Sequence, residues 1–506
     1  MKNLFFKYPN NIKKRLKELK IKSAFYWENL GKRYVDKLIK FTVNTTPAYK
    51  TFLKDNGINY KKISGFKDLK NLPVMDKNSY LRQYPYQELY PNKNLNLKTI
   101  SATSGSTGEP FYFIRGEKLD EQGLYVLELA FLNQWDIEKL NTLIVLGFGL
   151  GIWIGGLHNY YIYYRLSDKY KITTAPIGTN KELILKTIKK LHQFYNQIIL
   201  VGYPPFIKDI GDEAKNYDID FQKMKLRILN AAEGFSEEFR NYLAKIYGIE
   251  NIINDNINIY GTVELGTMAH ETAFSNLIRR IAIEKDKVFK VLFPEANRVP
   301  TLAQYHPYIV YFEEKDGLIL ASGYGDSIPL IRYSFSDKGG IISFDEMIKK
   351  IKSVGIDIFK EAEKYKIKNK ILKLPFVYVY ERKDFAVSLV GILIYPEYIR
   401  NALLKKTLQE YVTGKFSMLV EYDKKMDQKL IIHVELKKNI KPNEKIKQIV
   451  KTEIINSLLK NSTEYNYLFS TSNEKYKKQL EPEIILHHYE DPTYFKVGIK
   501  QKWTIK

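Results

Sequence analysis

Short apolar runs alternate with amphipathic stretches through the middle of this 506-residue chain, and this alternation constrains the fold more than any other feature. Residues 143–146 and 198–201 have the length and composition of buried strands, whereas residues 180–195 and 236–247 have helical spacing. A region from about 290 to 345 is richer in strand. Because strands that alternate with helices favour parallel pairing, we predict an α/β fold with mixed, largely parallel sheets flanked by helices.

The length of the chain suggests about three lobes, at roughly 100–200 residues per domain. A large N-terminal domain, residues 1–380, begins with a helical segment over residues 1–60. A strand-like run from Pro375 ends in the charged cluster Glu381-Arg382-Lys383-Asp384, and we place the domain boundary there. Residues 381–506 alternate strands with helices and predict a small α+β domain.

Finer elements are also predicted. Turns are expected at two glycine-containing pairs, Asp316-Gly317 and Gly339-Gly340. Single elements are expected at three places: a helix over about 344–366, a strand over 386–394 and a helix over 396–410.

The composition excludes some chemistry. The chain has no cysteine, so disulfides, thiolate nucleophiles and cysteine-ligated metals are excluded, and a reducing, cytoplasmic setting is expected. The formal charge is +23, which suits anionic cofactors, nucleic acid or anionic membranes. However, the basic runs 349–352 and 364–373 lie beside glutamates, as on solvated helix faces, so no dedicated nucleic-acid site is expected.

Membrane insertion is not expected either. The charge-free stretch 140–164 is interrupted by five glycines, which favours a buried strand, a glycine turn and a pocket wall over a transmembrane helix. The first residues lack the sustained apolar core of a signal peptide.

The most informative motif for function is Thr103 to Pro110, which reads Thr-Ser-Gly-Ser-Thr-Gly-Glu-Pro. Two glycines let successive backbone N–H groups converge on one anion, and four hydroxyls add donors at the same place. Such a loop suits triphosphate oxygens, although a solvated turn has the same composition. No Lys-Ser/Thr pair follows, so it is not a Walker loop.

Two later motifs carry acidic residues. In the run Tyr260 to Glu264, the carboxylate could hold Mg²⁺ beside phosphates and the tyrosine could stack on a base. In the run Pro329 to Asp337, the aspartate could accept from a ribose diol, or it could pair with Arg332 to close a strand end. A fourth element, Arg382 with Asp384, could be a salt bridge and nothing more.

Together with Ala231-Ala232-Glu233-Gly234, these motifs have an order that resembles the adenylate-forming (ANL) superfamily, and within it the phenylacetate–CoA ligase and capsular-polysaccharide branch. The resemblance spans about residues 25–440. It implies a large adenylation (AMP-binding) domain and a small C-terminal domain that acts as a mobile lid, with a hinge near Asp384.

The resemblance also implies residue roles. Glu264 would bind Mg²⁺, and Lys500 is the candidate for the catalytic lysine of the lid. The nucleotide would be held by residues of all the motifs: Thr103, Ser104, Gly105, Ser106, Thr107, Gly108, Ala232, Glu233, Tyr260, Gly261, Asp337 and Arg382.

The implied reaction uses ATP, Mg²⁺ and coenzyme A. A carboxylic acid, aryl or alkyl, would be activated as an acyl-adenylate and then transferred to coenzyme A. Two alternatives stay open. The acceptor could be a carrier-protein thiol or an amine in surface-polysaccharide or secondary metabolism. The chain could also be a nucleotide- or partner-binding protein that has lost efficient chemistry.

Departures from the family pattern motivate that last alternative. Val263 stands where the family has Thr or Ser before the metal-binding glutamate. Thr262, one place early, is the candidate for that catalytic hydroxyl, which it could supply only if the turn shifts. Ser336 stands where the family has Gly before the aspartate, and Glu381 where the hinge has Gly.

The acyl pocket is the part of the site that the sequence predicts least well. Aromatic residues that fall in segments expected to line it are Phe148, Trp153, Tyr203 and Phe206, although such residues are more often plain core than ligand wall. His158 and His270 are further candidates, with a hydrogen-bonded structural role as the alternative.

Overall fold

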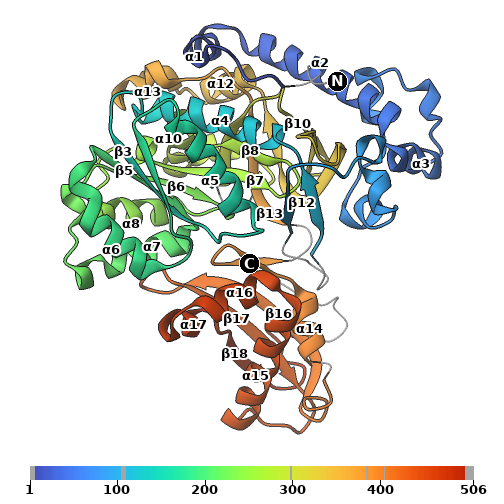
Figure 1. Ribbon diagram of the computed structural model, residues 1–506. Helices are drawn as coiled ribbons and strands as arrows, with labels where there is room; N and C mark the ends of the chain where they lie inside the picture. The colour runs from blue at the N-terminus through green and yellow to red at the C-terminus, as the bar shows by residue number, and fades with distance from the viewer. Residues whose placement is uncertain (1–5, 104–109, 297–298, 383–385, 404, 496–506) are drawn as a thin grey trace. The chain divides into compact units, whose positions relative to one another are not determined.

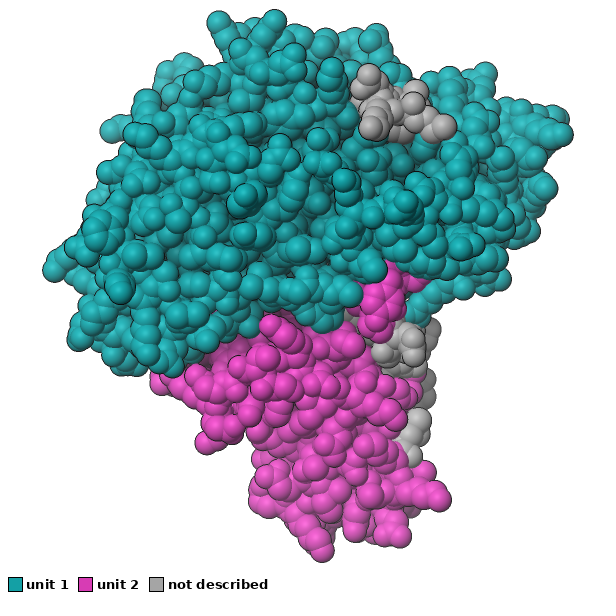
Figure 2. Space-filling model, in the orientation of Figure 1, with its two compact units in different colours: residues 1–101, 113–203, 207–381 teal, residues 102–112, 204–206, 382–506 magenta. Residues whose placement is uncertain are grey.

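The computed structural model describes residues 6–103, 110–296, 299–382, 386–403 and 405–495. The chain divides into two compact units, which Figure 2 colours separately. Unit 1 comprises residues 1–101, 113–203 and 207–381, and unit 2 comprises residues 102–112, 204–206 and 382–506.

The chain begins with three helices of the predicted helical segment: α1 (Ile12–Ile21), α2 (Ala24–Thr45) and α3 (Pro47–Asp55). The long helix α2 starts at Ser23, whose side chain accepts from the backbone N–H of Tyr26, as expected of an N-cap. Its buried face includes Trp27, Val35 and Leu38. The predicted periodicity is therefore present as an amphipathic helix that packs on the rest of unit 1.

An 11-stranded sheet forms the centre of unit 1, in the order β10-β11-β12-β13-β9-β8-β7-β6-β5-β3-β4. Its strands are β3 (Thr142–Gly147), β4 (Ile172–Pro176), β5 (Gln197–Gly202), β6 (Leu226–Ala231), β7 (Asn256–Thr262), β8 (Gly266–His270), β9 (Thr301–Tyr305), β10 (Val310–Lys315), β11 (Leu318–Gly323), β12 (Leu330–Ile342) and β13 (Phe376–Arg382). A separate small hairpin is formed by β1 (Thr99–Ala102) and β2 (Tyr112–Arg115).

One half of the large sheet is parallel and the other half is largely antiparallel. Strands β4, β3, β5, β6 and β7 pair in parallel, whereas β7–β8, β8–β9, β9–β13, β10–β11 and β11–β12 are antiparallel. All six residues of β3 and all six of β5 are buried, as expected for parallel strands with both faces covered. The predicted mixed α/β fold is confirmed.

Helices surround the large sheet, and those between β3 and β7 along the chain connect its parallel strands (Figure 1). They are α4 (Lys118–Gln134), α5 (Ile154–Ser167), α6 (Lys181–Leu191), α7 (Pro204–Glu213), α8 (Glu237–Tyr247), α9 (Ile252–Asp255), α10 (Ala273–Glu284), α11 (Asp286–Leu292), α12 (Phe344–Ser353) and α13 (Ile358–Lys364). Helix α4 packs on β8, and α5 packs on β3 and β4. The charge-free stretch 140–164 is thus a buried strand, a glycine turn and a helix.

Unit 2 contains a three-stranded sheet and its own apolar core. Its elements are β14 (Val387–Leu389), β15 (Ile392–Ile394), α14 (Pro396–Leu403), β16 (Val412–Tyr422), β17 (Gln428–Leu436), α15 (Glu444–Asn461), α16 (Thr463–Thr471), α17 (Glu474–Leu480) and β18 (Glu483–His487). β16 and β17 are antiparallel, and β18 joins β17 in parallel. Its composition of strands and helices is α+β.

Two of the predicted turns have different outcomes. Asp316-Gly317 is a turn with both residues at positive φ, 54° and 74°, and it joins β10 to β11. The prediction at Gly339-Gly340 was wrong, because β12 runs through both glycines. A Cβ at Gly339 would collide with the carbonyl oxygen of Tyr378 on β13. These glycines therefore allow close approach of two strands and do not mark a turn.

Three single elements were also predicted too long. The helix expected over 344–366 is broken into α12 and α13 near Gly355, which has a φ of 82°. The strand expected over 386–394 is the hairpin β14–β15, which turns at Val390 and Gly391. The helix expected over 396–410 ends at Leu403.

Candidate functional site

The carboxyl ends of the parallel strands lie at one edge of the sheet, and several predicted site residues follow them directly. Phe148 follows β3 and Tyr203 follows β5. Strands β3 and β5 are neighbours in the sheet. From β3 the chain continues to β4 on one side of this pair, and from β5 it continues to β6 on the opposite side, so the direction of the topology switches between β3 and β5. Ligands of such sheets bind in the crevice at this switch. The rings of Phe148 and Tyr203 meet edge to face there, with centroids 4.8 Å apart.

Two acidic residues and two tyrosines connect β7 and β12 reciprocally. Tyr260 of β7 donates its hydroxyl to Oδ2 of Asp337 in β12, at 2.6 Å. Tyr333 of β12 donates to Oε1 of Glu264, in the turn that follows β7, at 3.3 Å. Both carboxylates are nearly buried, with 9% exposure for Glu264 and 5% for Asp337. The structure therefore brings together three residues that the sequence singled out, and adds a fourth.

The turn that holds Glu264 is tight. It occupies the residues between β7 and β8, and Thr262 at the end of β7 accepts from the backbone N–H of Leu265, at 3.4 Å. Gly261 is exposed and pairs with Thr267 across the hairpin, and a Cβ there would approach the carbonyl oxygen of Gly266 to 2.7 Å. The hydroxyl of Thr262 thus stabilises the turn itself, one residue before the position at which the family has its hydroxyl.

The backbone of β12 explains the glycine that usually precedes the aspartate. Ser336 has a φ of 65°, in the left-handed region that glycine adopts without strain. Its N–H bonds to the hydroxyl of Ser334, at 3.2 Å. Ser336 therefore adopts a conformation that glycine would adopt without strain, and Asp337, the next residue, accepts from Tyr260.

Arg332 in the same strand has a structural role. Its guanidinium donates to the carbonyl oxygens of Lys70 and Leu72, at 2.8 and 2.5 Å. Backbone bonds from Met75 to residues 332 and 334 hold the same segment against β12. These contacts fasten the N-terminal segment to the strand that carries Asp337, and they account for the arginine without a strand-closing Arg332–Asp337 pair.

The loop between β6 and α8, residues 232–236, carries two of the predicted nucleotide-binding residues, Ala232 and Glu233. Ala232 is exposed and has a φ of 79°, which is costly for a residue with a side chain. The carbonyl oxygen of Glu233 accepts from the side-chain amide of Asn258 on β7, at 2.8 Å. We call these residues the β6–α8 loop below.

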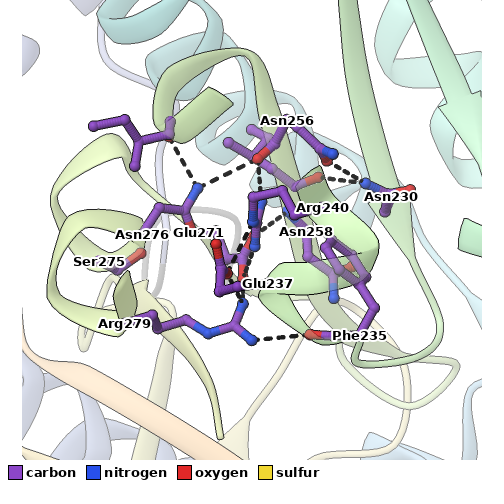
Figure 3. Close-up of polar contacts among 12 residues, drawn as sticks. Asn230, Phe235, Glu237, Arg240, Asn256, Asn258, Glu271, Ser275, Asn276 and Arg279 are labelled. Atoms are coloured by element: carbon purple, nitrogen blue, oxygen red, sulfur yellow. Dashed lines mark hydrogen bonds and ion pairs between the residues drawn. The ribbon is translucent and has the colours of Figure 1, made fainter. Parts of the chain in front are cut away.

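A buried ion network lies under this loop (Figure 3). Glu271, fully buried after β8, accepts from Arg240 at 2.8 and 2.9 Å, from Arg279 at 2.7 Å and from the N–H of Asn258 at 2.9 Å. Glu237 pairs with Arg240 and Arg279, at 2.9 and 3.1 Å. Burial acts to raise the pKa of Glu237, but Arg240, Arg279 and Arg280 outweigh it and hold that pKa below its ordinary value.

His158 belongs to a second buried network. Its Nδ1 lies 2.7 Å from Oδ1 of Asp120, and its Nε2 lies 3.3 Å from the hydroxyl of Thr267 on β8. Arg115, at the end of β2, donates to the same oxygen of Asp120 at 2.5 Å and to Ser101 of β1 at 3.0 Å. Burial acts to raise the pKa of Asp120, but His158 and Arg115 lower it below its ordinary value. Both nitrogens of His158 face protein groups, which favours its structural alternative.

The remaining pocket candidates are placed as follows. Trp153 is the N-cap residue of α5, partly buried, and Phe206 in α7 is 3% exposed. His270 ends β8, where its Nδ1 lies 2.9 Å from the carbonyl oxygen of Glu271. Burial lowers the pKa of His270 and so favours the neutral ring. His270 is therefore a core residue, with its tautomer set by that carbonyl.

Several predicted residues lie outside the described part of the chain: Ser104, Gly105, Ser106, Thr107, Gly108, Asp384 and Lys500. The base of the phosphate loop is described. Thr103 and Phe111 exchange two bonds, from Thr103 N–H to Phe111 O and from Phe111 N–H to the Thr103 hydroxyl, both at 3.0 Å. Arg382 is the last residue of β13. The predicted roles of these residues remain predictions.

Sequence reasoning missed Tyr333, Asn258 and the Glu271 network. Tyr333 lies inside a motif that the sequence singled out, and its place in a strand with Asp337 was the available signal. Asn258 precedes Tyr260 by two positions and so shares its face of β7. The partners of Glu271 come from α8, β7 and α10, and no local pattern connects them.

Proteins with this architecture include acyl-CoA ligases. The crystal structure of 2-hydroxyisobutyryl-CoA ligase in complex with 2-HIB-AMP and CoA, in the thioesterification state, matches with a TM-score of 0.65 at 12% identity and covers 97% of this chain and 91% of that chain. The same ligase in the postadenylation state with 2-HIB-AMP matches with a TM-score of 0.53, at the same identity and coverage. At this identity the likeness establishes the fold.

One curated relative is similar in sequence. Phenylacetate-coenzyme A ligase of Thermus thermophilus is 20% identical over 240 residues, which are 47% of this chain and 50% of the ligase. The chain therefore aligns with about half the length of this relative. It matches no family profile.

The fold and the distant sequence similarity agree with the order of the motifs. The chain has the fold of the adenylate-forming superfamily, and the predicted resemblance to that superfamily is confirmed at this level. None of the helices in the described residues combines the length and apolarity needed to cross a bilayer.

Proposed function

We propose that the protein is an ATP- and Mg²⁺-dependent ligase that converts a carboxylic acid into an acyl-adenylate and then into an acyl-CoA. One observation carries the proposal: Tyr260, Glu264, Tyr333 and Asp337 interlock across β7 and β12, beside strand ends where α/β folds bind ligands. The coenzyme A ligases that share the fold and the distant sequence similarity support it.

The residues present fit a magnesium ion that accompanies ATP. Mg²⁺ keeps several waters and takes one or two carboxylates together with phosphate oxygens. Glu264 offers one such carboxylate, nearly buried, and its hydrogen bond within the described residues comes from a neutral phenol at 3.3 Å. A carboxylate with spare lone pairs at the sheet edge suits this ion, which would neutralise charge on the phosphoryl oxygens.

The other residues would bind and orient the nucleotide. Asp337 would accept from the ribose hydroxyls, and its bond from Tyr260 holds both side chains in one arrangement. The ring of Tyr260 lies nearly parallel to that of Phe312, with centroids 6.1 Å apart, so its plane is fixed for contact with the adenine. The β6–α8 loop would run along the other edge of the base.

The chemistry follows from this orientation. A carboxylate oxygen of the acid attacks the α-phosphorus of ATP, the bond to the bridging oxygen breaks, and pyrophosphate leaves. The coenzyme A thiol, as it loses its proton, then attacks the acyl carbon, and AMP leaves. Because the enzyme supplies positions and charge and no nucleophile, the absence of cysteine from the chain is consistent with it.

The acid itself would enter the crevice between β3 and β5. Phe148 is 1% exposed and belongs to the apolar core, and the partly buried ring of Tyr203 packs against it, so Tyr203 would present the aromatic surface at this place. Aromatic and aliphatic acids are therefore the substrate class to test.

Pyrophosphate exchange into ATP, measured over a panel of aryl and alkyl acids with Mg²⁺, tests the proposal. Exchange with a subset of acids, followed by acyl-CoA formation, is the expected result. Exchange without consumption of coenzyme A would indicate that another acceptor, such as a carrier-protein thiol or an amine, takes the acyl group. Tight ATP binding with no exchange for any acid would overturn the ligase assignment in favour of a binding protein.

A further inference from the structure

The buried network of Figure 3 includes a contact with the backbone of the β6–α8 loop that structural packing alone does not require. Arg279 donates from Nη2 to the carbonyl oxygen of Phe235 at 2.9 Å, while its Nη1 pairs with Glu271 and Glu237. One planar guanidinium therefore joins two buried carboxylates to the loop. Lysine, a point charge on a flexible stem, cannot make these contacts from one rigid plane.

We propose that Arg279, held by Glu271 and Glu237, is a positioning residue that sets the β6–α8 loop in the conformation that binds the adenine nucleotide. The inference rests on the proposed function, because it gives the loop the nucleotide as its ligand. It adds a determinant from α10 that none of the nucleotide motifs contains.

The loop needs an external support. Ala232 is held at a φ of 79°, a conformation that a non-glycine residue leaves unless its surroundings determine it. Two carbonyl oxygens that follow it are fixed from outside the loop, Glu233 by Asn258 and Phe235 by Arg279. Asn258 is itself fixed, because its N–H donates to Glu271 and its carbonyl oxygen accepts from the Glu271 N–H. Both supports therefore lead back to Glu271.

Burial of these charged side chains costs desolvation free energy, so the network needs a reason beyond stability. Glu271 and Arg240 are completely buried, and Arg279 is 2% exposed. Apolar residues of similar volume are often as stabilising as a buried ion network. The network does what apolar packing cannot, because hydrogen-bond donors fix backbone carbonyls at defined points and a charged donor such as Arg279 does so strongly.

The neighbouring arginine provides a matched control. Arg280 also lies on α10 and also pairs with Glu237, at 3.3 Å, but its other contact is the side chain of Asn241 at 3.1 Å. A lysine at position 280 leaves both supports of the β6–α8 loop intact, whereas a lysine at position 279 removes one. The two variants have the same change of chemistry at adjacent positions.

The experiment compares the full-length wild type, Arg279→Lys and Arg280→Lys. Calorimetry measures AMP and ATP binding, and hydrogen–deuterium exchange reports on the loop peptide. Arg279→Lys should weaken AMP binding about tenfold, as the loss of a charged hydrogen bond implies, and should speed exchange in the loop. It should raise the KM for ATP while the KM for the acid is unchanged. Arg280→Lys should match the wild type in every measurement.

The outcomes separate two failures. If the wild type binds neither AMP nor ATP, the proposed function fails and the inference fails with it. If the wild type binds AMP and both variants bind it equally well or equally badly, the positioning role is overturned while the proposed function stands.

A second variant covers the case in which Arg279→Lys does not fold. The double change Glu237→Gln with Arg279→Gln removes one charge of each sign and so leaves the network balanced. It should fold, bind AMP about tenfold more weakly and show fast exchange in the loop. Wild-type AMP affinity in this folded variant would also overturn the inference.

Discussion

Glu264 and Glu271 are two buried glutamates on the same β7–β8 hairpin, and their surroundings are opposite. Glu271 faces two guanidiniums and a backbone N–H, with four contacts of 2.7 to 2.9 Å. Glu264, among the described residues, accepts from the hydroxyl of Tyr333 at 3.3 Å. Burial alone therefore does not distinguish a structural carboxylate from one available to a ligand.

The difference lies in how fully each carboxylate is satisfied. A buried carboxylate that accepts charged hydrogen bonds at all its lone pairs stabilises the fold when both partners are present. A buried carboxylate with one weak bond has lost its water without full compensation, and this arrangement is typical of a group that receives a cation. The hairpin thus carries one carboxylate for structure and one for the proposed chemistry.

The largest expected effect is on stability. Glu271→Gln leaves Arg240 and Arg279 buried without their full counter-charge, so the free energy of unfolding should fall by about 3–5 kcal/mol. Denaturant unfolding of the full chain measures it. The control is Glu238→Gln, an exposed glutamate in the first turn of α8, which should change stability by less than about 0.5 kcal/mol. A loss below about 1 kcal/mol for Glu271→Gln would remove the contrast between the two glutamates.

Glu264→Gln should have the opposite effect to Glu271→Gln, with little change in stability and a large loss of activity. The amide keeps the shape and can still accept from Tyr333, so the free energy of unfolding should change by less than about 1 kcal/mol. Pyrophosphate exchange should fall at least about 100-fold, because the charge that meets the metal is gone. The rate is measured over a Mg²⁺ titration. Full exchange activity in this variant would show that the metal is held elsewhere.

The pH dependence of stability tests the role of Glu237 in the buried ion network. The folded-state pKa of Glu237 lies below its ordinary value, so the folded protein releases this proton more readily than the unfolded chain. Its contribution is complete above about pH 4.5 and is lost as the pH falls toward the folded-state pKa, at up to about 1.4 kcal/mol per pH unit. Glu237→Gln should flatten the acid limb of the stability curve. An unchanged acid limb would mean that other carboxylates control it.

The smallest expected effect concerns the backbone beside Asp337. Ser336→Gly removes the strain of a serine at a φ of 65° but increases the entropy of the unfolded chain, so stability should rise by no more than about 1 kcal/mol. Thermal unfolding measures it, and exchange activity should be retained. Ser334→Gly is not equivalent, because the Ser334 hydroxyl accepts from the N–H of residue 336. A marked loss of activity in Ser336→Gly would give the serine a role of its own.

Much of the fold followed from local patterns. Period and apolar length predicted β3, β5, α6 and α8 close to their observed bounds, because a buried parallel strand and an amphipathic helix are encoded in consecutive residues. The prediction at Gly339-Gly340 was wrong for a tertiary reason. Those glycines allow the close approach of Tyr378 on another strand, and the residues next to them in the sequence do not indicate this contact.

The candidate site was predictable in part. Tyr260, Glu264 and Asp337 were identified because their types suit a base, a cation and a ribose, and the structure places them together. His158 was a pocket candidate with a hydrogen-bonded structural role as the alternative, and its contacts with Asp120 and Thr267 favour that alternative. A single histidine carries no information in the sequence about which partners the fold gives it.

By itself, the sequence determined the alternation of strands and helices, the absence of cysteine chemistry and the set of motifs in their order. The folded arrangement alone fixes that Glu271 is saturated by hydrogen bonds while Glu264, among the described residues, accepts from Tyr333. The physical reason is that the guanidiniums around Glu271 come from α8 and α10, and the phenol beside Glu264 comes from β12. Burial and pairing of a charge depend on elements that are distant along the chain, and the same residue type therefore has different roles at two positions of one hairpin.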